Sequence, residues 1–168
     1  PRPGQDRLIR FIANALERGR HSVVESGTGT GKTVSSLAAT VPFAKRNGKR
    51  IIYLTRTKSQ QKQVLTELRE MSSVIDVFGV AIQGRSAATC PRMCDDPDLR
   101  SGSPEEMSRL CSHLKSKKDG GGCKYYDAIR NIDTEVYVDD LLDSMPDPES
   151  FMEQCIEDGL CPYEIMKA

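Results

Sequence analysis

Residues 25–34 read E-S-G-T-G-T-G-K-T-V and follow a short apolar run at residues 21–24. This order predicts a strand, a phosphate-binding loop and a helix that starts near Lys32. Glycines let the loop backbone bring its N–H groups close to phosphate oxygens, and the N-terminal end of the helix attracts negative charge. Lys32 would reach the β- and γ-phosphates, and Thr33 would ligate Mg²⁺. We therefore expect a nucleoside triphosphate site made by Ser26, Gly27, Thr28, Gly29, Thr30, Gly31, Lys32 and Thr33.

Strand and helix patterns alternate around this loop. Apolar runs predict strands at residues 22–24, 49–55 and 77–82. Helical periodicity predicts helices at residues 3–18, 31–47 and 59–71, with Pro42 causing a kink or an early end of the second helix. Near-continuous apolar strands between helices are typical of parallel sheets covered on both faces. The expected fold class is therefore α/β, built on an open, mostly parallel sheet.

The formal net charge of zero conceals two halves of opposite charge. Residues 1–85 carry 15 Lys and Arg against 6 Asp and Glu, a net of +9, and residues 86–168 carry 9 against 18, a net of −9. This change predicts two domains, 1–85 and 86–168. The basic half could bind a polyanion such as nucleic acid, or its cations could simply solvate helix faces.

Two polar features of the basic half have a functional and an ordinary interpretation. Thr55, Arg56 and Thr57 follow the second predicted strand, where open α/β sheets place ligand contacts, and they offer hydroxyls and a guanidinium to a phosphate backbone. They could equally be solvated residues at a strand end. Gln5 could pair with the edge of an adenine, or it could be a surface residue of the first helix.

All six cysteines lie in the acidic half, which is poor in large apolar residues. A unit with so little core material often needs a metal centre, and thiolates suit zinc or iron–sulfur clusters. The spacings match neither a zinc finger nor a short ferredoxin motif, and six thiols exceed the four that one cluster needs. Free thiols are the alternative. Short helices are expected at residues 103–118, 125–131, 137–144 and 148–159.

Several segments together resemble one family. They are S-G-T-G-T-G-K-T-V-S-S-L, I-I-Y-L-T-R-T-K-S-Q, G-R-S-A-A-T-C, C-K-Y-Y-D and G-L-C-P-Y-E. In combination they look like the iron–sulfur superfamily 2 DNA helicases of the XPD type, with an archaeal-like short insert. The resemblance implies a partial RecA-like domain at residues 1–85 and a small, mainly helical iron–sulfur domain at residues 86–168.

The resemblance also implies roles for single residues. Lys32 and Thr33 would hold the ATP phosphates and Mg²⁺, and Gln5 would contact adenine. Thr55, Arg56 and Thr57 would contact single-stranded DNA, as would Lys124 and Tyr125 by charge and stacking, unless the latter two serve a capping turn and the core. A 4Fe–4S cluster would be ligated by Cys90, Cys111, Cys123 and Cys161. Cys94 lies close enough to replace Cys90, and Cys155 is the clearest spare.

One departure limits what the chain alone would do. No D-E-A-H acid pair occurs in the 168 residues. The resemblance then implies the N-terminal part of a longer, monomeric 5′–3′ helicase in DNA repair, inactive without its second RecA-like and arch domains. Its DNA partners would be single strands and forks. We expect a cytoplasmic or nuclear protein with no membrane partner, since no signal peptide or long apolar run occurs. The alternative is a zinc-stabilised nucleotide-binding regulatory module without unwinding activity.

Overall fold

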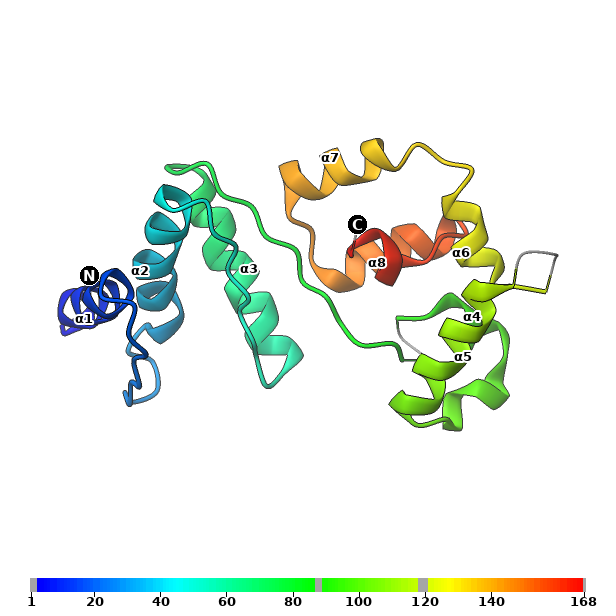
Figure 1. Cartoon of the computed structure of the whole chain (residues 1–168), viewed down its shortest axis with the longest axis horizontal. Coiled ribbons are helices and arrows are strands. Elements are labelled where there is room, and N and C mark those ends of the chain that lie inside the picture. Colours follow the sequence, from blue (N-terminus) through cyan, green and yellow to red (C-terminus); the bar gives the residue numbers. More distant parts are fainter. Residues whose placement is uncertain (1–2, 87–88, 118–120, 168) are drawn as a thin grey trace. The chain divides into compact units, whose positions relative to one another are not determined.

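The computed structural model describes residues 3–86, 89–117 and 121–167, and the chain divides into two compact units, Pro1–Val77 and Phe78–Ala168 (Figure 1). The composition change that follows Arg85 therefore falls inside the second unit. Each unit has its own buried residues, and the two are described separately below.

Three helices form among residues 3–77 of the first unit: α1 (Gln5–Glu17), α2 (Lys32–Arg46) and α3 (Lys58–Ser72). α2 packs against both of the others. The buried side chains come from the inner faces of α2 and α3 and include Leu37, Val41, Leu65 and Leu68. α2 continues through Pro42 to Arg46, so the early end suggested by this proline does not occur.

The second unit is built from short helices joined by loops. They are α4 (Pro91–Asp95), the 3₁₀ helix η1 (Pro97–Ser101), α5 (Pro104–Ser116), α6 (Lys124–Ile129), α7 (Thr134–Ser144), α8 (Pro148–Glu157) and α9 (Pro162–Ile165). A first apolar cluster joins α7, α8 and α9 around Phe151. Two smaller clusters surround Met107 and Leu114 on α5. Cys90, Cys123, Cys155 and Cys161 lie in or against these clusters.

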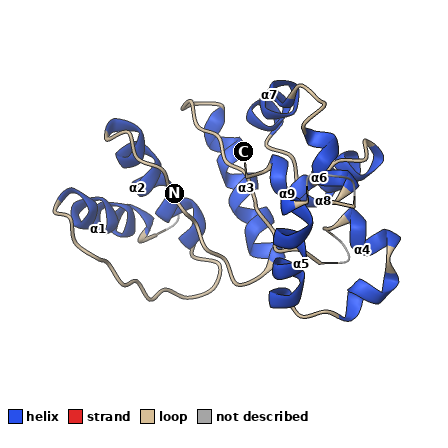
Figure 2. Ribbon diagram, turned by 45° about the vertical axis from the view of Figure 1, so that its right-hand side comes forward, coloured by secondary structure: helices blue, strands red, loops and turns tan. Residues whose placement is uncertain are grey.

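The predicted parallel sheet is wrong. Figure 2 shows helices and loops only, and no strand occurs among residues 3–86, 89–117 and 121–167. The segments at residues 22–24, 49–55 and 77–82 run as loops, and most of their large apolar side chains are exposed: Val23 is 93% exposed and Ile52 is 85% exposed, while the small Ala81 is buried. A parallel strand needs neighbours on its hydrogen-bonding edges and layers over its faces. These apolar runs have neither here, so the α/β class and the RecA-like sheet are not formed.

The helix predictions are confirmed to within a few residues at each end, and side-chain caps define the start of some of these helices. Ser103 accepts the Glu106 N–H at 3.2 Å, and the Glu106 carboxylate accepts the Ser103 N–H at 2.7 Å. This reciprocal capping box starts α5, whose first residue is Pro104. Gly31 holds a left-handed φ of 78° at the start of α2. In the part of the chain that is described, no helix combines the length and apolarity needed to cross a membrane.

Candidate functional site

The glycine-rich loop of the first unit enters α2 through two left-handed residues. Gly29 has φ 72° and Gly31 has φ 78°, a region that glycine occupies without a steric penalty. Lys32 is then the first residue of α2, and Thr33 follows it, half-buried. The loop and the helix N-terminus therefore meet where the sequence predicts phosphate contacts.

Side chains close this loop on itself. The Lys32 ammonium donates to the carbonyl oxygens of Ser26 at 2.8 Å and Gly27 at 2.6 Å. The Thr30 hydroxyl donates to the Gly27 carbonyl at 2.9 Å and lies 2.7 Å from the Ser26 hydroxyl. Residues 26–32 thus bring together the Lys32 ammonium, the hydroxyls of Ser26 and Thr30, and the N-terminus of α2.

Gln5 lies beside the loop. Its side-chain amide nitrogen is so close to Gly31 that a Cβ atom on Gly31 would overlap it. Gln5 also lines an open hollow of about 350 Å³ together with residues of the loop and of α1, including Ser26, Thr30, Leu8 and Phe11. The structure therefore brings Gln5 to the loop, as the predicted nucleotide site requires.

The triplet Thr55, Arg56 and Thr57 leads into α3. The Thr57 hydroxyl caps this helix by accepting the Gln60 N–H at 3.2 Å, and the Gln60 side chain accepts the Arg56 N–H at 3.0 Å. Arg56 and Thr57 are exposed, and Thr55 is half-buried. An exposed guanidinium therefore stands beside a helix N-terminus, which also favours anions.

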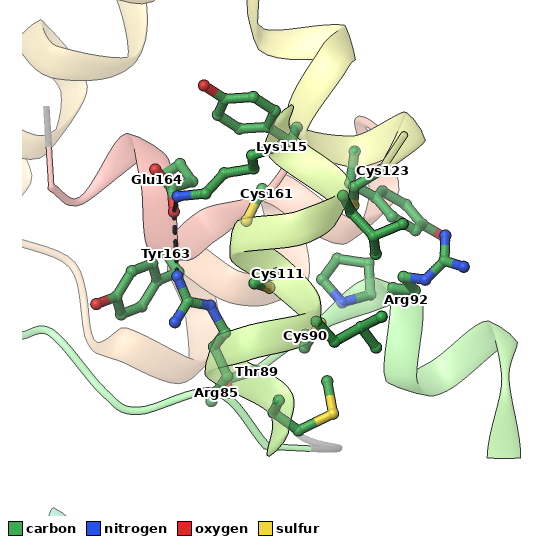
Figure 3. A pocket seen from close by; sticks show the side chains of 16 residues that line it. Arg85, Thr89, Cys90, Arg92, Cys111, Lys115, Cys123, Cys161, Tyr163 and Glu164 are labelled. Atoms are coloured by element: carbon green, nitrogen blue, oxygen red, sulfur yellow. Dashed lines mark hydrogen bonds and ion pairs between the residues drawn. The ribbon is translucent and has the colours of Figure 1, made fainter. Parts of the chain in front are cut away.

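Four of the six cysteines line one cavity in the second unit (Figure 3). Its volume is about 20 Å³, enough for about one water molecule. Three of the thiols come from residues that immediately precede short helices, and the fourth comes from the middle of α5. These four are the predicted ligands Cys90, Cys123, Cys161 and Cys111.

The other two cysteines lie apart from the cavity lining. Cys94 is exposed near the end of α4. Cys155 is fully buried in the cluster around Phe151. The placement favours Cys90 over Cys94 as the fourth thiol of the set.

Burial raises the pKa values of two of the cavity thiols, Cys161 and Cys111. It raises the pKa of Cys161 to about 11, and it raises the pKa of Cys111 while the nearby charges of Arg85 and Lys115 act in the opposite direction. Thiolates are the ligand form of cysteine, so a bound cation would have to displace these protons.

A carboxylate joins the two cations beside the cavity. Glu164 Oε1 accepts from the Lys115 ammonium at 2.9 Å and from the Arg85 guanidinium at 3.2 Å. The Arg85 guanidinium also lies 3.9 Å from the centre of the Tyr163 ring. Figure 3 shows both cations converging on Glu164 next to Cys111 and Cys161. The side of the cavity nearest these two thiols is therefore lined by a partly buried ion-pair network.

A second polar contact links the segments of Cys90 and Cys123. The Tyr125 hydroxyl donates to Asp95 at 2.6 Å, and the Lys124 ammonium pairs with the same carboxylate oxygen at 2.8 Å. Tyr125 is buried, and the side chain of Lys124 is 72% exposed. The hydrogen bond that Lys124 donates is the main cause that lowers the pKa of Asp95, and the hydrogen bond from Tyr125 is the second cause. The burial favours a structural role for Tyr125 over base stacking.

The donors that line the cavity are of the type that soft metal centres use. Four thiols converge from four segments, and thiolates select zinc and iron–sulfur clusters. Within the described ranges, no three His, Cys, Asp or Glu side chains are already arranged to hold a metal ion. The fit therefore rests on the type of donor and on the cavity that the four thiols share, and no coordination geometry is formed among the described residues.

Comparison with known families decides the classification. The sequence model of the DEAD_2 family matches residues 53–168, and that of the type III restriction enzyme res subunit matches residues 1–97. The chain belongs to the DEAD_2 family. The resemblance to XPD-type superfamily 2 helicases is thereby confirmed.

Curated relatives of this DEAD_2 chain carry helicase names. It is 27% identical over 187 residues to the general transcription and DNA repair factor IIH helicase subunit XPD/RAD3 of Saccharomyces cerevisiae, covering 98% of the chain and 23% of the relative. It is 30% identical over 162 residues to the ATP-dependent DNA helicase DinG of Salmonella choleraesuis, covering 84% of the chain and 22% of the relative. DinG of Escherichia coli K12 is 29% identical over the same share. The chain thus spans less than a quarter of these relatives.

The sequence did not predict roles for Glu164, which lines the cysteine cavity, or for Asp95, which contacts the lining residue Tyr125. Asp95 and Glu164 each read as ordinary surface acids, because their partners lie far along the chain. Tyr125 is 30 residues from Asp95, and Lys115 is 49 residues from Glu164. The only hint of a role at the cavity was the position of Glu164 three residues after Cys161.

Proposed function

We propose that this chain is the nucleotide-binding and thiol-rich part of an ATP-dependent DNA helicase. The observation that carries the proposal is the closed loop from Ser26 to Lys32, which enters α2 with Gln5 against Gly31. Family membership and the names of the yeast and bacterial relatives support the same class.

The nucleotide would be held by residues of the first unit. The Lys32 ammonium would exchange its two carbonyl partners for β- and γ-phosphate oxygens, and the Thr33 hydroxyl would ligate Mg²⁺. The backbone of Gly27 to Gly31 would donate N–H groups to the phosphates. Gln5, from its place beside Gly31, would read the adenine edge.

Single-stranded DNA would be contacted at the start of α3. Arg56 and Thr57 stand at its N-terminus, where a phosphate gains a guanidinium, a hydroxyl and the helix dipole. Lys124 in the second unit offers a further exposed cation. Translocation in the 5′–3′ direction, unwinding of forks and a role in DNA repair belong to the same proposal, with a second RecA-like domain as the partner of the nucleotide site.

Cys90, Cys111, Cys123 and Cys161 would ligate a 4Fe–4S cluster in the second unit. When bound, such a cluster supplies four metal–thiolate bonds that cross-link these segments. The cavity lined by these four thiols, to the exclusion of Cys94 and Cys155, supports this ligand set.

Substitution of Lys32 tests the proposal. In the full-length protein, ATP hydrolysis should rise on addition of single-stranded DNA, and Lys32→Ala should abolish this stimulation. Lys45→Ala is a matched control, because Lys45 lies on the same helix but pairs with Asp76. Stimulated hydrolysis that survives Lys32→Ala, or that Lys45→Ala removes equally, would contradict the assignment.

A further inference from the structure

One carboxylate oxygen of Glu164 binds two cations from different parts of the second unit. Lys115 donates at 2.9 Å and Arg85 at 3.2 Å. The side chains are only 25%, 16% and 14% exposed for Lys115, Arg85 and Glu164. Removing one member of a shielded pair leaves the others poorly solvated, so these contacts constrain geometry more than open surface pairs do.

The three charged residues sit next to cysteine-bearing positions. Arg85 lies five residues before Cys90, Lys115 lies one helical turn after Cys111 on α5, and Glu164 lies three residues after Cys161. Three of the four thiol-bearing segments therefore meet at one oxygen atom.

The fourth segment is joined to the same frame by neighbouring contacts. The Cys161 N–H donates to the Tyr125 carbonyl at 3.1 Å, which links the residue before α9 to α6. The Tyr125 hydroxyl in turn donates to Asp95 on α4. The Lys115 ammonium also lies 5.4 Å from the centre of the Tyr126 ring on α6. All four cysteine positions are thus connected by polar contacts that involve no metal.

We propose that Glu164 is a positioning residue that holds the segments of Cys111 and Cys161 together at the cavity independently of a bound metal. This inference rests on the proposed thiol-ligated centre. It concerns what holds the thiol-bearing segments together and does not depend on which metal is bound.

A purely electrostatic role for Glu164 makes a different prediction. Glu164→Gln removes a negative charge near the thiols and would favour thiolates, whereas Arg85→Gln and Lys115→Gln remove positive charges and would disfavour them. Loosening of the frame should increase the reactivity of the thiols in all three variants, because each variant breaks a contact with Glu164. The sign of the effect therefore separates positioning from charge.

The experiment measures alkylation by iodoacetamide at each cysteine of the metal-free 168-residue chain, using peptide mass spectrometry. Cys94 is an exposed reference, and Cys155 reports opening of the core around Phe151. We expect Glu164→Gln, Arg85→Gln and Lys115→Gln each to accelerate Cys111 and Cys161 by about tenfold, which corresponds to ~1.4 kcal/mol of local opening. Cys94 and Cys155 should react at unchanged rates. Glu153→Gln, at an exposed position on α8, is the matched control and should change nothing.

Two results would overturn the inference. Acceleration by Glu164→Gln together with slowing by Arg85→Gln and Lys115→Gln would show that only charge is involved. Equal acceleration of Cys155 would show general unfolding. Should Glu164→Gln fail to fold by circular dichroism, Lys115→Gln keeps the Arg85 contact and carries the test. Iron and zinc content of the wild-type protein is measured separately, so failure of the proposed centre would appear there and leave the alkylation result readable.

Discussion

The side-chain amide of Gln5 on α1 fills the space where a Cβ atom on Gly31 would stand. Gly31 also needs a left-handed backbone to start α2. One glycine therefore serves two purposes, because it shapes the loop and leaves room for the side chain expected to read the base.

Gly31→Ala should separate these two purposes. The left-handed φ predicts a loss of about 1 kcal/mol in the free energy of unfolding. Gly48→Ala should lose a similar amount, because Gly48 has φ 58° with open space around it. Since Gln5 can rotate away from the new Cβ atom, we expect little further loss of stability for Gly31→Ala. Because this rotation removes Gln5 from the proposed adenine contact, ATP binding should become at least tenfold weaker. Urea unfolding and titration with a fluorescent ATP analogue measure the two quantities.

Gln5→Ala completes this comparison. It should leave stability nearly unchanged and lower the preference for ATP over GTP, because it removes the amide and keeps the loop. An unchanged preference would remove Gln5 from the proposed site.

Substitution of the cysteines should separate ligands from bystanders. Single changes to Ser at Cys90, Cys111, Cys123 or Cys161 should each lower bound iron and acid-labile sulfide to near zero, because each removes one of four cavity thiols. Cys94→Ser should keep the full content. Cys155→Ala should also keep it, while costing about 1 kcal/mol of stability through a small cavity in the core. Stoichiometric zinc in protein purified without oxygen would instead support the regulatory-module alternative.

The capping box of α5 should matter to the helix that carries Cys111. Ser103→Ala removes the acceptor for the Glu106 N–H and should cost about 1 kcal/mol of unfolding free energy. Ser108→Ala, at an exposed position inside the same helix, should be neutral or slightly stabilising because alanine is the better helix former. Thermal unfolding followed by circular dichroism compares the two variants. Equal effects would argue against a specific role of the cap.

Alkaline pH should weaken the second unit through Tyr137. Its hydroxyl donates to Asp158 at 2.8 Å, and this bond, assisted by burial, raises the pKa of Tyr137 to about 12. A group whose pKa is raised on folding stabilises the protein below its unfolded pKa of about 10, and this contribution is lost as pH rises towards 12. Tyr137→Phe should therefore remove a late step in the ultraviolet tyrosinate titration and flatten the stability curve over this range. Tyr53→Phe, in the first unit, should leave the stability curve of the second unit unchanged.

The sequence predicted features that depend on nearby residues. The helix at residues 104–116 was visible from Ser103, Pro104 and Glu106, and the loop from its glycines and Lys32. The four cavity cysteines were found through the family resemblance, since their spacing alone left alternatives open. Each of these features depends on residues within one or two turns of chain or on a known motif.

Features that depend on distant partners were missed or mistaken. The apolar run from Ile51 to Leu54 has the composition of a buried strand, but burial requires pairing that the run does not find, and Leu54 remains 87% exposed. Asp95 carried no local signal and Glu164 carried only its position three residues after Cys161, because their roles exist only once α4, α5, α6 and α9 have packed. Periodicity cannot report such contacts.

The hydrogen bond from the Cys161 N–H to the Tyr125 carbonyl also bears on biogenesis. The cavity joins residues 90 and 161, so it cannot close until the chain has been synthesised through Cys161 and has left the ribosome. Until then Cys90, Cys111 and Cys123 are thiols without their common partner segment, and they are open to oxidation or to stray metal ions. Formation of the contact between Cys161 and Tyr125 is therefore the step that ends this vulnerable interval during synthesis.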